Sequence, residues 1–321
     1  MSSGLPRRVH AEHATCIFRG IVPDRLLGHG TIIAQRASVT CHSVIDLHTH
    51  SNVSDGSDPP HRIPELAAAA GCRAVALTDH DRLDGVAAAG ARAAELGIEL
   101  VPGCEISCEV DRGTMHVLVY FVEDGEGPLQ DTLVRLQRAR DTRNERMVAR
   151  LVELGVPVTV EEVEQEAGGS GVGRPHVAAV LVRHGAADSI QDAFDRWLAK
   201  GRPAYLDKER LTPDEAMRLA RASGGVPVLA HPFSLELEPA PLEERVGELA
   251  ALGLAGIEAV YGRYTQDDRA GLTALARRRD LVATGGSDHH GTYKPDLHVG
   301  VGTGDLDVPD TALEALRARR P

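Results

Sequence analysis

A short apolar strand leads into two histidines in the stretch Val44-Ile45-Asp46-Leu47-His48-Thr49-His50. Side chains two residues apart in an extended chain point to the same side, so His48 and His50 can face one site. A single histidine is more often a satisfied core or surface residue than a metal ligand, so this pair alone is weak evidence. The ends of the other strands therefore decide whether a metal site is present.

Short apolar strands alternate with Ala-rich helices along much of the chain. A helix is predicted over residues 85–97, and strands are predicted over residues 44–47, 74–77, 98–102, 117–121, 226–230, 256–260 and 281–284. This alternation is typical of α/β proteins. No glycine-rich phosphate-binding loop opens the first helix, so about seven strands indicate a closed, mostly parallel (β/α) barrel rather than a doubly wound sheet.

The order of these patterns predicts one barrel that is interrupted once. A long charged helical pattern runs over residues 129–154, and Thr212 and Glu215 form a capping box where the alternation of strands and helices resumes. Residues 1–43 show neither helical nor strand periodicity. We therefore predict an N-terminal extension without regular structure at 1–43, a first barrel part at 44–127, a helical insertion at 128–205 and a second barrel part at 206–321.

Composition narrows the class of ligand. Of the 321 residues, 42% are hydrophobic but only 3% are aromatic, so a stacking surface for long nucleic acid would have few rings. A formal net charge of −12 repels polyphosphate backbones and anionic membranes. We therefore expect a small substrate, with neither a membrane nor a long nucleic acid as partner.

Cysteine usage and hydropathy predict a cytoplasmic protein. The five cysteines form no Cys-x-x-Cys pair and leave one odd member, a pattern typical of a reducing compartment. No apolar run approaches the roughly 20 residues that span a bilayer. The first 40 residues lack the continuous apolar stretch of a signal peptide. None of these features indicates an oligomeric state.

Metal-binding side chains follow the predicted strands at five separate places. Beyond the first pair of histidines they occur in Thr78-Asp79-His80-Asp81, Gly103-Cys104-Glu105, Ala230-His231-Pro232 and Ser287-Asp288-His289-His290. Functional residues of (β/α) barrels gather at the C-terminal ends of the strands, so these groups should meet in space. His116 does not fit this rule, because it precedes its strand. Either that strand runs against the others or the histidine reaches the site from a loop.

The number of candidate ligands indicates more than one ion. Imidazoles and carboxylates together suit Zn, Mn or Fe, and the set exceeds what one tetrahedral ion can use. Two or three ions that share a bridging carboxylate would use all of the donors.

The same motifs, together with Ser54-Asp55-Gly56, resemble those of the PHP domain, which is named for polymerases and histidinol phosphatase. The resemblance runs from about Val44 to Gly300. The insertion, with Gly173-Arg174-Pro175-His176, resembles the branch of stand-alone PHP phosphoesterases that includes nucleoside 3′,5′-bisphosphate phosphatases. It implies a distorted seven-stranded (β/α) barrel that holds two to three divalent ions (Mn, Zn or Fe) and hydrolyses a small phosphate monoester such as a nucleoside 3′,5′-bisphosphate.

The resemblance also implies a set of metal ligands. His48, His50, Glu105 and Asp288 would surround a first ion, Glu105 would bridge to a second ion held also by His116 and His231, and Asp55, His80 and His290 would hold a third. Some members of the family have histidine at the position of Asp55. A carboxylate there weakens the third site or changes its preferred metal.

Hydrolysis by such a site needs no protein nucleophile. Two ions about 3.5–4 Å apart lower the pKa of a bridging water, supply hydroxide at neutral pH and neutralise the phosphoryl oxygens. Glu105 and Asp288 would carry catalysis by holding the ions, and either the third ion or His176 would assist the leaving oxygen. Arg174, His176 and Lys294 are predicted to bind the substrate, Arg174 because its planar fork suits a pair of phosphate oxygens.

Four other functions remain open. Two keep phosphoester hydrolysis but change the substrate to short RNA, cut by a 5′-3′ exonuclease, or to a histidinol-phosphate-type compound. A third is hydrolysis of C–N bonds, but the carboxylated lysine that many amidohydrolases use is not available before Lys200. The fourth is a metal-binding regulatory module without turnover, which the complete ligand set disfavours.

Overall fold

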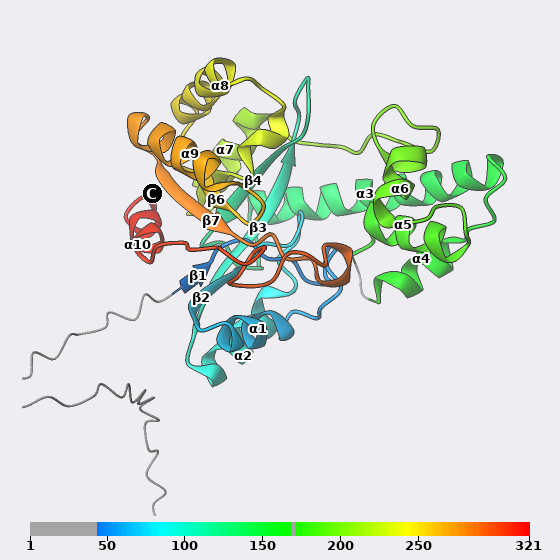
Figure 1. Ribbon diagram of the computed structural model, residues 1–321, viewed down its shortest axis with the longest axis horizontal. Coiled ribbons are helices and arrows are strands. Elements are labelled where there is room, and N and C mark those ends of the chain that lie inside the picture. The colour runs from blue at the N-terminus through cyan, green and yellow to red at the C-terminus, as the bar shows by residue number, and fades with distance from the viewer. Residues whose placement is uncertain (1–43, 169–170) are drawn as a thin grey trace, which may run out of the picture. The chain divides into compact units, whose positions relative to one another are not determined.

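The strands form one sheet that nearly closes into a barrel (Figure 1). The computed structural model describes residues 44–168 and 171–321. Over those residues the sheet has seven strands in sequence order, β1 (Val44–Asp46), β2 (Cys72–Leu77), β3 (Glu99–Cys108), β4 (Met115–Tyr120), β5 (Val226–Leu229), β6 (Gly256–Tyr261) and β7 (Val282–Gly286). The amide of Leu47 donates to the carbonyl of Gly285 at 3.1 Å, which brings the first strand beside the last. The predicted seven-stranded α/β barrel is thus confirmed, and the extension predicted for residues 1–43 lies outside the described residues.

One strand runs against the others. β4 is antiparallel to β3 and to β5, while the other paired strands are parallel. The start of β4 therefore lies beside the C-terminal ends of its neighbours. This direction explains why His116, which opens β4, precedes its strand and still lies at the same end of the barrel as the other candidate ligands.

β3 is longer than the predicted strand at 98–102. Its first half pairs with β2 as far as Pro102, and its second half pairs with β4 from Gly103 to Cys108. Glu105 therefore lies inside a strand rather than after it. The apolar pattern is interrupted at Pro102 and Gly103, but hydrogen bonds to β4 carry the strand onward.

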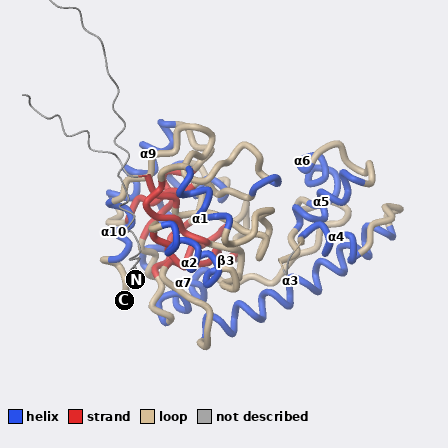
Figure 2. Tube along the Cα trace, turned by 90° about the horizontal axis from the view of Figure 1, so that it is seen from below, coloured by secondary structure: helices blue, strands red, loops and turns tan. Residues whose placement is uncertain are grey.

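Helices surround the sheet, as Figure 2 shows. They are α1 (Arg62–Ala69), α2 (Val86–Leu96), α7 (Pro213–Ala222), α8 (Pro239–Ala251), α9 (Gln266–Arg278) and α10 (Thr311–Arg317), with short 3₁₀ turns η2 (Pro232–Leu235) and η3 (Gly291–Tyr293) at strand ends. α2 ends at Gly97, whose φ of 70° a residue with a side chain rarely adopts. α7 begins with the predicted capping box of Thr212 and Glu215. In the described residues, no helix combines the length and apolarity that crossing a membrane requires.

The segment between β4 and α7 is helical. It contains α3 (Pro128–Glu153), α4 (Val160–Ala167), α5 (Arg174–Arg183), α6 (Ile190–Ala193) and a π-helical turn η1 (Phe194–Leu198). The first half of α3 packs on the barrel helices through residues such as Leu133, while its second half packs through Met147 against Val177 and Leu181 of α5. One long helix therefore belongs to two cores, and it ties the insertion to the barrel.

Alternation along the strands separates the barrel interior from its outer layer. On β4, Leu118 and Tyr120 belong to a core cluster built from several strands and closed by α10, whereas Val117 and Val119 pack with the outer helices. Residues an even number of positions from Leu118 on this strand therefore face inward. His116 is two positions from Leu118, so its side chain is turned toward the barrel interior.

Candidate metal centre and active site

Glu105 lies at the centre of the site. It is only 1% exposed, and it alternates with Cys104, which packs on the outer helices, so its carboxylate faces the barrel interior. Its Oε2 atom lies 3.3 Å from Nε2 of His48, 3.1 Å from Nε2 of His50 and 3.2 Å from Nδ1 of His80. Imidazoles from the ends of β1 and β2 thus gather around one carboxylate oxygen.

The other carboxylate oxygen of Glu105 faces a different pair of histidines. Its Oε1 atom lies 2.9 Å from Nδ1 of His116 and 3.0 Å from Nε2 of His231. Each oxygen of Glu105 therefore has its own group of imidazoles. This division is the arrangement that a carboxylate bridging two ions requires.

Asp288, after β7, adds a second carboxylate to the first group. Its Oδ1 atom lies 3.5 Å from Nε2 of His48 and of His50, and 3.3 Å from Nδ1 of His290. Burial opposes ionisation of Asp288, but Lys294 and His290 outweigh it and hold the pKa of the carboxyl well below its ordinary value. The backbone of Asp288 has a φ of 56°, and a strained conformation of this kind is common at functional sites.

The second oxygen of Asp288 points away from the histidines. Its Oδ2 atom accepts a hydrogen bond from the hydroxyl of Tyr261 at 2.8 Å and one from Nζ of Lys294 at 2.5 Å. Lys294, a predicted substrate ligand, is thus an ion-pair partner of Asp288. Together these two donors leave Oδ1 directed at the imidazoles.

Asp55 forms a third group with His80 and His290. Its Oδ1 atom lies 3.3 Å from Nε2 of His290, and its Oδ2 atom lies 3.8 Å from Nε2 of His80. His50 lies at the edge of the same group, because its Nδ1 atom is 3.8 Å from Oδ1 of Asp55. All nine predicted metal-ligand residues therefore converge, although they span more than 240 residues of sequence.

The donor set fits divalent metal ions. The buried Nδ1 atom of His50 has no hydrogen-bond partner among the described residues, which would be costly without a ligand. His48 and His50 bring their Nε2 atoms to 3.1 Å from each other. Tetrahedral ligands about 2.05 Å from an ion are about 3.3 Å apart, so this spacing matches a shared ion.

The protonation states of Glu105 and His50 suit metal binding. Burial opposes ionisation of Glu105, but His80 and His116 outweigh it and hold the pKa of that carboxyl well below its ordinary value. Burial and the neighbouring His290 lower the pKa of His50 to about 4. Ionised carboxylates and neutral imidazoles are the forms that bind metal ions.

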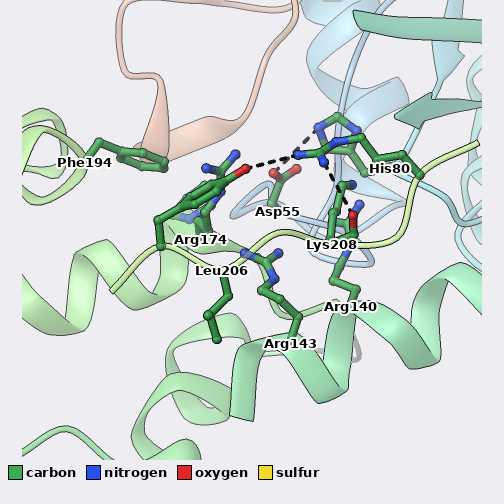
Figure 3. A pocket seen from close by; sticks show the side chains of 12 residues that line it. Asp55, His80, Arg140, Arg143, Arg174, Phe194, Leu206 and Lys208 are labelled. Carbon is green, nitrogen blue, oxygen red and sulfur yellow. Dashed lines mark hydrogen bonds and ion pairs between the residues drawn. The ribbon is translucent and has the colours of Figure 1, made fainter. Parts of the chain in front are cut away.

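A basic cavity of about 110 Å³ adjoins the donor cluster (Figure 3). Asp55 and His80 form its wall on the side of the metal ligands. Its cationic lining consists of Arg140, Arg143, Arg174, Lys208 and Arg210. The insertion and the segment that follows it supply all of these cations. The cavity therefore has the charge and the position to hold an anionic group next to the candidate ions.

Arg143 is the cation of this cavity whose charge is least balanced by hydrogen-bond and ion-pair partners. It is 6% exposed, its Nε atom has no hydrogen-bond partner, and it forms no ion pair with a carboxylate within the described part of the chain. Burial and the neighbouring Arg174 and Arg140 lower its pKa to about 9. A buried guanidinium without an anion is unfavourable, so the cavity is suited to an anionic ligand.

Arg174 lines the cavity in a fixed orientation. Its guanidinium carbon lies 5.5 Å from the ring centre of Phe194 and 5.8 Å from that of Tyr205, and Nη1 donates to the carbonyl of Leu198 at 3.3 Å. Contacts with two rings restrict the side chain at little cost to its charge. The predicted substrate ligand Arg174 is therefore at the site.

His176 is placed differently from the other predicted site residues. Its ring is fully buried at the start of α5, Nδ1 accepts a hydrogen bond from the amide of Gly173 at 2.9 Å, and the ring packs edge-on against Tyr293. The residues that line the basic cavity include Gly173 and Arg174 but not His176. The structure thus places His176 at the start of α5, close in sequence to the residues that line the cavity but not among them.

Sequence reasoning missed several residues of the site. They are Glu258 and Tyr261 on β6, Arg140 and Arg143 on α3, and Lys208 after the insertion. The alternation of inward-facing and outward-facing residues on β6 could have indicated Glu258, an acid inside an apolar strand. Arg140 and Arg143 are three residues apart and share a face of a helix. Many charged residues on solvent-exposed helix faces have the same spacing, so the pattern alone does not indicate a site.

The fold and the donor cluster define a barrel-type protein with a candidate metal centre, and comparisons with known proteins give its reaction class. The model of the PHP domain matches residues 46–201. The chain is 31% identical to the 3′,5′-nucleoside bisphosphate phosphatase of Chromobacterium violaceum, over 80% of this chain and 90% of that protein. It is also 31% identical to the 5′-3′ exoribonuclease Rnm of Escherichia coli, over 79% of this chain and 87% of that protein.

A solved structure from Bifidobacterium adolescentis, assigned as a metal-dependent phosphoesterase, has a TM-score of 0.78 and 28% identity, and the match covers 87% of this chain and 97% of that one. The chain belongs to the PHP domain family of metal-dependent phosphoesterases. The expected family, fold and reaction class are therefore confirmed.

Proposed function

We propose that this enzyme hydrolyses a small phosphate monoester that carries a second anionic group, with a nucleoside 3′,5′-bisphosphate as the leading candidate. The observation that carries the proposal is the basic cavity beside the donor cluster. A simple monophosphate bound at the donor cluster would leave the buried Arg143 of the cavity without an anionic partner. The name of the Chromobacterium violaceum relative supports the same substrate class.

The proposed cofactors are two to three divalent ions, Mn, Zn or Fe. The first would bind His48, His50, Glu105 and Asp288, the second Glu105, His116 and His231, and the third Asp55, His80 and His290. When bound, such ions would act as Lewis acids toward the phosphoryl oxygens and lower the pKa of a bound water. Glu105 and Asp288 are the catalytic carboxylates of the proposal because they hold these ions.

The protein's own side chains would orient the substrate. The reacting phosphate would lie at the donor cluster, and the second anion would lie among Arg143, Arg174 and Lys208 in the cavity. Binding energy from a remote group of this kind is realised as orientation of the reacting group. Lys294 remains partly exposed beside Asp288 and is proposed to face the reacting phosphate.

His176 keeps a role in the proposal, but through the backbone. By accepting a hydrogen bond from the amide of Gly173, it fixes the first turn of α5, the helix that begins at Arg174. We therefore propose His176 as a positioning residue for Arg174, in place of the role as proton donor for which it was one of two candidates. Assistance to the leaving oxygen would then fall to the third ion.

A second candidate function is exonuclease action on short RNA. A further cavity of about 220 Å³ shares Arg174, Phe194, Tyr205 and Arg210 with the basic cavity. Its lining mixes aromatic and polar groups, so it could hold more of a longer substrate. The name of the Escherichia coli relative favours this reading.

Substitution of the cavity arginines tests the proposal. For Arg143→Ala and Arg174→Ala, we expect kcat/KM toward adenosine 3′,5′-bisphosphate to fall about tenfold to a hundredfold, because each loses a charge-assisted contact. The kcat/KM toward p-nitrophenyl phosphate should change little, and metal content should stay intact. Arg202→Ala, at an exposed position of the same insertion, is the matched control.

Two outcomes would contradict this proposal. Equal losses on both substrates would place the arginines at the reacting phosphate or in the structure alone. Faster release of 5′-nucleotides from a short 5′-phosphorylated RNA than of phosphate from the bisphosphate would favour the exonuclease.

A further inference from the structure

Glu258 is a buried acid that touches two of the candidate metal ligands without belonging to their set. It lies on β6, is 0% exposed, and alternates with Ile257 and Ala259, which pack on the outer helices. Its Oε1 atom lies 2.9 Å from Nδ1 of His48, and its Oε2 atom accepts a hydrogen bond from the backbone amide of His231 at 2.7 Å. One carboxylate therefore connects residues that follow β1 and β5.

The surroundings of Glu258 give no other reason for a charge at this position. Within residues 44–168 and 171–321, no lysine or arginine forms an ion pair with it, and His48 is its partner. Burying a carboxylate is costly unless its oxygens are paired and hydrogen-bonded. Both oxygens are used here, and both are used by candidate ligands.

The contact with His48 selects one form of that imidazole. When Nδ1 carries the proton and donates it to Oε1 of Glu258, Nε2 keeps a free lone pair. Nε2 is the atom that faces Oε2 of Glu105 at 3.3 Å and Oδ1 of Asp288 at 3.5 Å. Carboxylates that hold metal-binding histidines in this way both orient the ring and make it a stronger ligand.

The contact with His231 holds a strained stretch of backbone. His231 has φ 25° and ψ 68°, outside the regions that residues with a side chain prefer, and such strain persists only where surrounding contacts impose it. Its ring is then directed so that Nδ1 pairs with Oγ of Ser234 and Nε2 faces Oε1 of Glu105. The bond from the amide to Glu258 therefore helps to aim Nε2.

We propose that Glu258 is a positioning residue that couples the two ion sites sharing Glu105. Its Oε1 atom selects the tautomer of His48 that can bind the first ion. Its Oε2 atom holds the backbone of His231 so that the ring is directed at the second site. The third group, built on Asp55 and His290, has no contact with Glu258 among the described residues. The inference rests on the proposed metal sites, but it does not depend on which phosphate ester is hydrolysed.

Glu258→Gln is the sharpest variant, because a glutamine has one acceptor oxygen for two donors. Either His48 changes tautomer or the amide of His231 loses its partner. We expect affinity for Zn²⁺ at two of the sites to fall about tenfold to a hundredfold, as for other carboxylates behind metal-binding histidines. Affinity should be measured on the full chain after chelator treatment, by competition with a coloured chelator.

A second measurement reads the tautomer directly. In the metal-free protein, the ¹⁵N signals of the His48 ring, assigned with a His48→Ala variant, should report Nδ1–H in the wild type. They should report a smaller Nδ1–H fraction in Glu258→Gln. Glu248→Gln, at an exposed position on α8, is the control and should change neither measurement.

The outcomes separate this inference from the proposed function. Unchanged zinc affinity at every site, or an unchanged Nδ1–H fraction at His48, would overturn the role of Glu258 while leaving the phosphatase intact. Weaker zinc binding in an enzyme without bisphosphatase activity would support the role and contradict the substrate. If Glu258→Gln does not fold, Glu258→Asp keeps the charge but shortens the reach, and wild-type zinc affinity in that variant would also overturn the inference.

Discussion

Nζ of Lys208 lies 3.2 Å from Oδ2 of Asp81, and this contact joins the segment after the insertion to the end of β2. The same oxygen lies 2.5 Å from Nη2 of Arg140 on α3. Asp81 itself is held to the barrel, because its Oδ1 atom accepts from the amide of Ser107. A carboxylate fixed to the barrel thus positions two cations of the cavity relative to the metal ligands.

Asp81→Asn should destabilise the protein and weaken binding of doubly charged substrates. The three side chains are nearly buried, and removing the charge of one partner in such a group typically costs about 3–5 kcal/mol. Urea unfolding followed by circular dichroism measures the loss. Asp84→Asn, which removes an exposed partner of Arg82, should change stability by less than about 1 kcal/mol. A loss for Asp81→Asn as small as that for Asp84→Asn would show that the cluster does not act as a unit.

The charge of Lys208 should make substrate selectivity depend on pH. Burial and the facing Arg140 and Arg143 lower the pKa of Lys208 to about 7, although Asp81 opposes this change. Lys208 therefore loses its proton as pH rises through about 7, and the cavity then holds anions less well. The ratio of kcat/KM for the bisphosphate to that for p-nitrophenyl phosphate should fall across this range, since pH effects common to both substrates cancel in the ratio.

Lys208→Arg should remove that pH dependence, because arginine stays charged. Stability moves the other way with pH. The unfolded chain, with a lysine pKa near 10.4, binds more protons than the folded chain between about pH 7 and pH 10, so this residue makes unfolding less favourable as pH rises there. A selectivity ratio that stays flat in the wild type would contradict the assignment of Lys208 to the cavity.

Most of the fold could be predicted because its signals are local. The strands are apolar runs bounded by turn residues, and α2 ends at Gly97 where the backbone needs a positive φ. The reversed direction of β4 could be named only as one of two explanations for the position of His116, because pairing is a property of two strands. For the same reason β3 seemed to end at Pro102, while its continuation depends on hydrogen bonds to β4.

The part of the site that lies at strand ends could be predicted from the sequence. His48 and Asp288 lie in compact motifs at strand ends, so the barrel itself brings them together. The cavity cations Arg143 and Lys208 converge only after the insertion has folded against the barrel, and nothing in the local sequence distinguishes them from solvated charges. Glu258 was not predicted, because an acid inside an apolar strand belongs to no recognisable motif. Only its position in the alternation of inward-facing and outward-facing residues marks it.

Gly286 should not tolerate a side chain. A Cβ atom there would lie 2.4 Å from Cβ and 2.5 Å from the backbone nitrogen of His48, so β7 would have to move away from β1. We expect Gly286→Ala to cost about 1–3 kcal/mol, as overpacking does, and to weaken zinc binding. Gly271→Ala on α9 meets no atom within 4 Å and should stabilise the protein by about 0.5–1 kcal/mol. Equal stabilities in urea unfolding would contradict the close approach of β7 to His48.

Loss of Glu105 should be the most damaging single change in the metal centre. Its two oxygens face separate groups of imidazoles, at 3.1 Å for His50 and 2.9 Å for His116, so its removal affects both groups at once. Two ions without a bridging carboxylate would also repel each other. We expect Glu105→Ala to lose at least two ions per chain, measured by mass spectrometry of the metals, and to lose phosphatase activity with them.

Thermal unfolding gives the same prediction a second measurement. Ions that bind only the folded chain stabilise it by about 2.7 kcal/mol at a free concentration one hundred times Kd. Added Zn²⁺ or Mn²⁺ should therefore raise the Tm of the chelator-treated wild type, while Glu105→Ala should show little increase. Glu109→Ala, an exposed position just after β3, should behave like the wild type in both measurements. Full metal content and turnover in Glu105→Ala would mean that the ions are held elsewhere, since among the described carboxylates only Glu105 faces both His50 and His116.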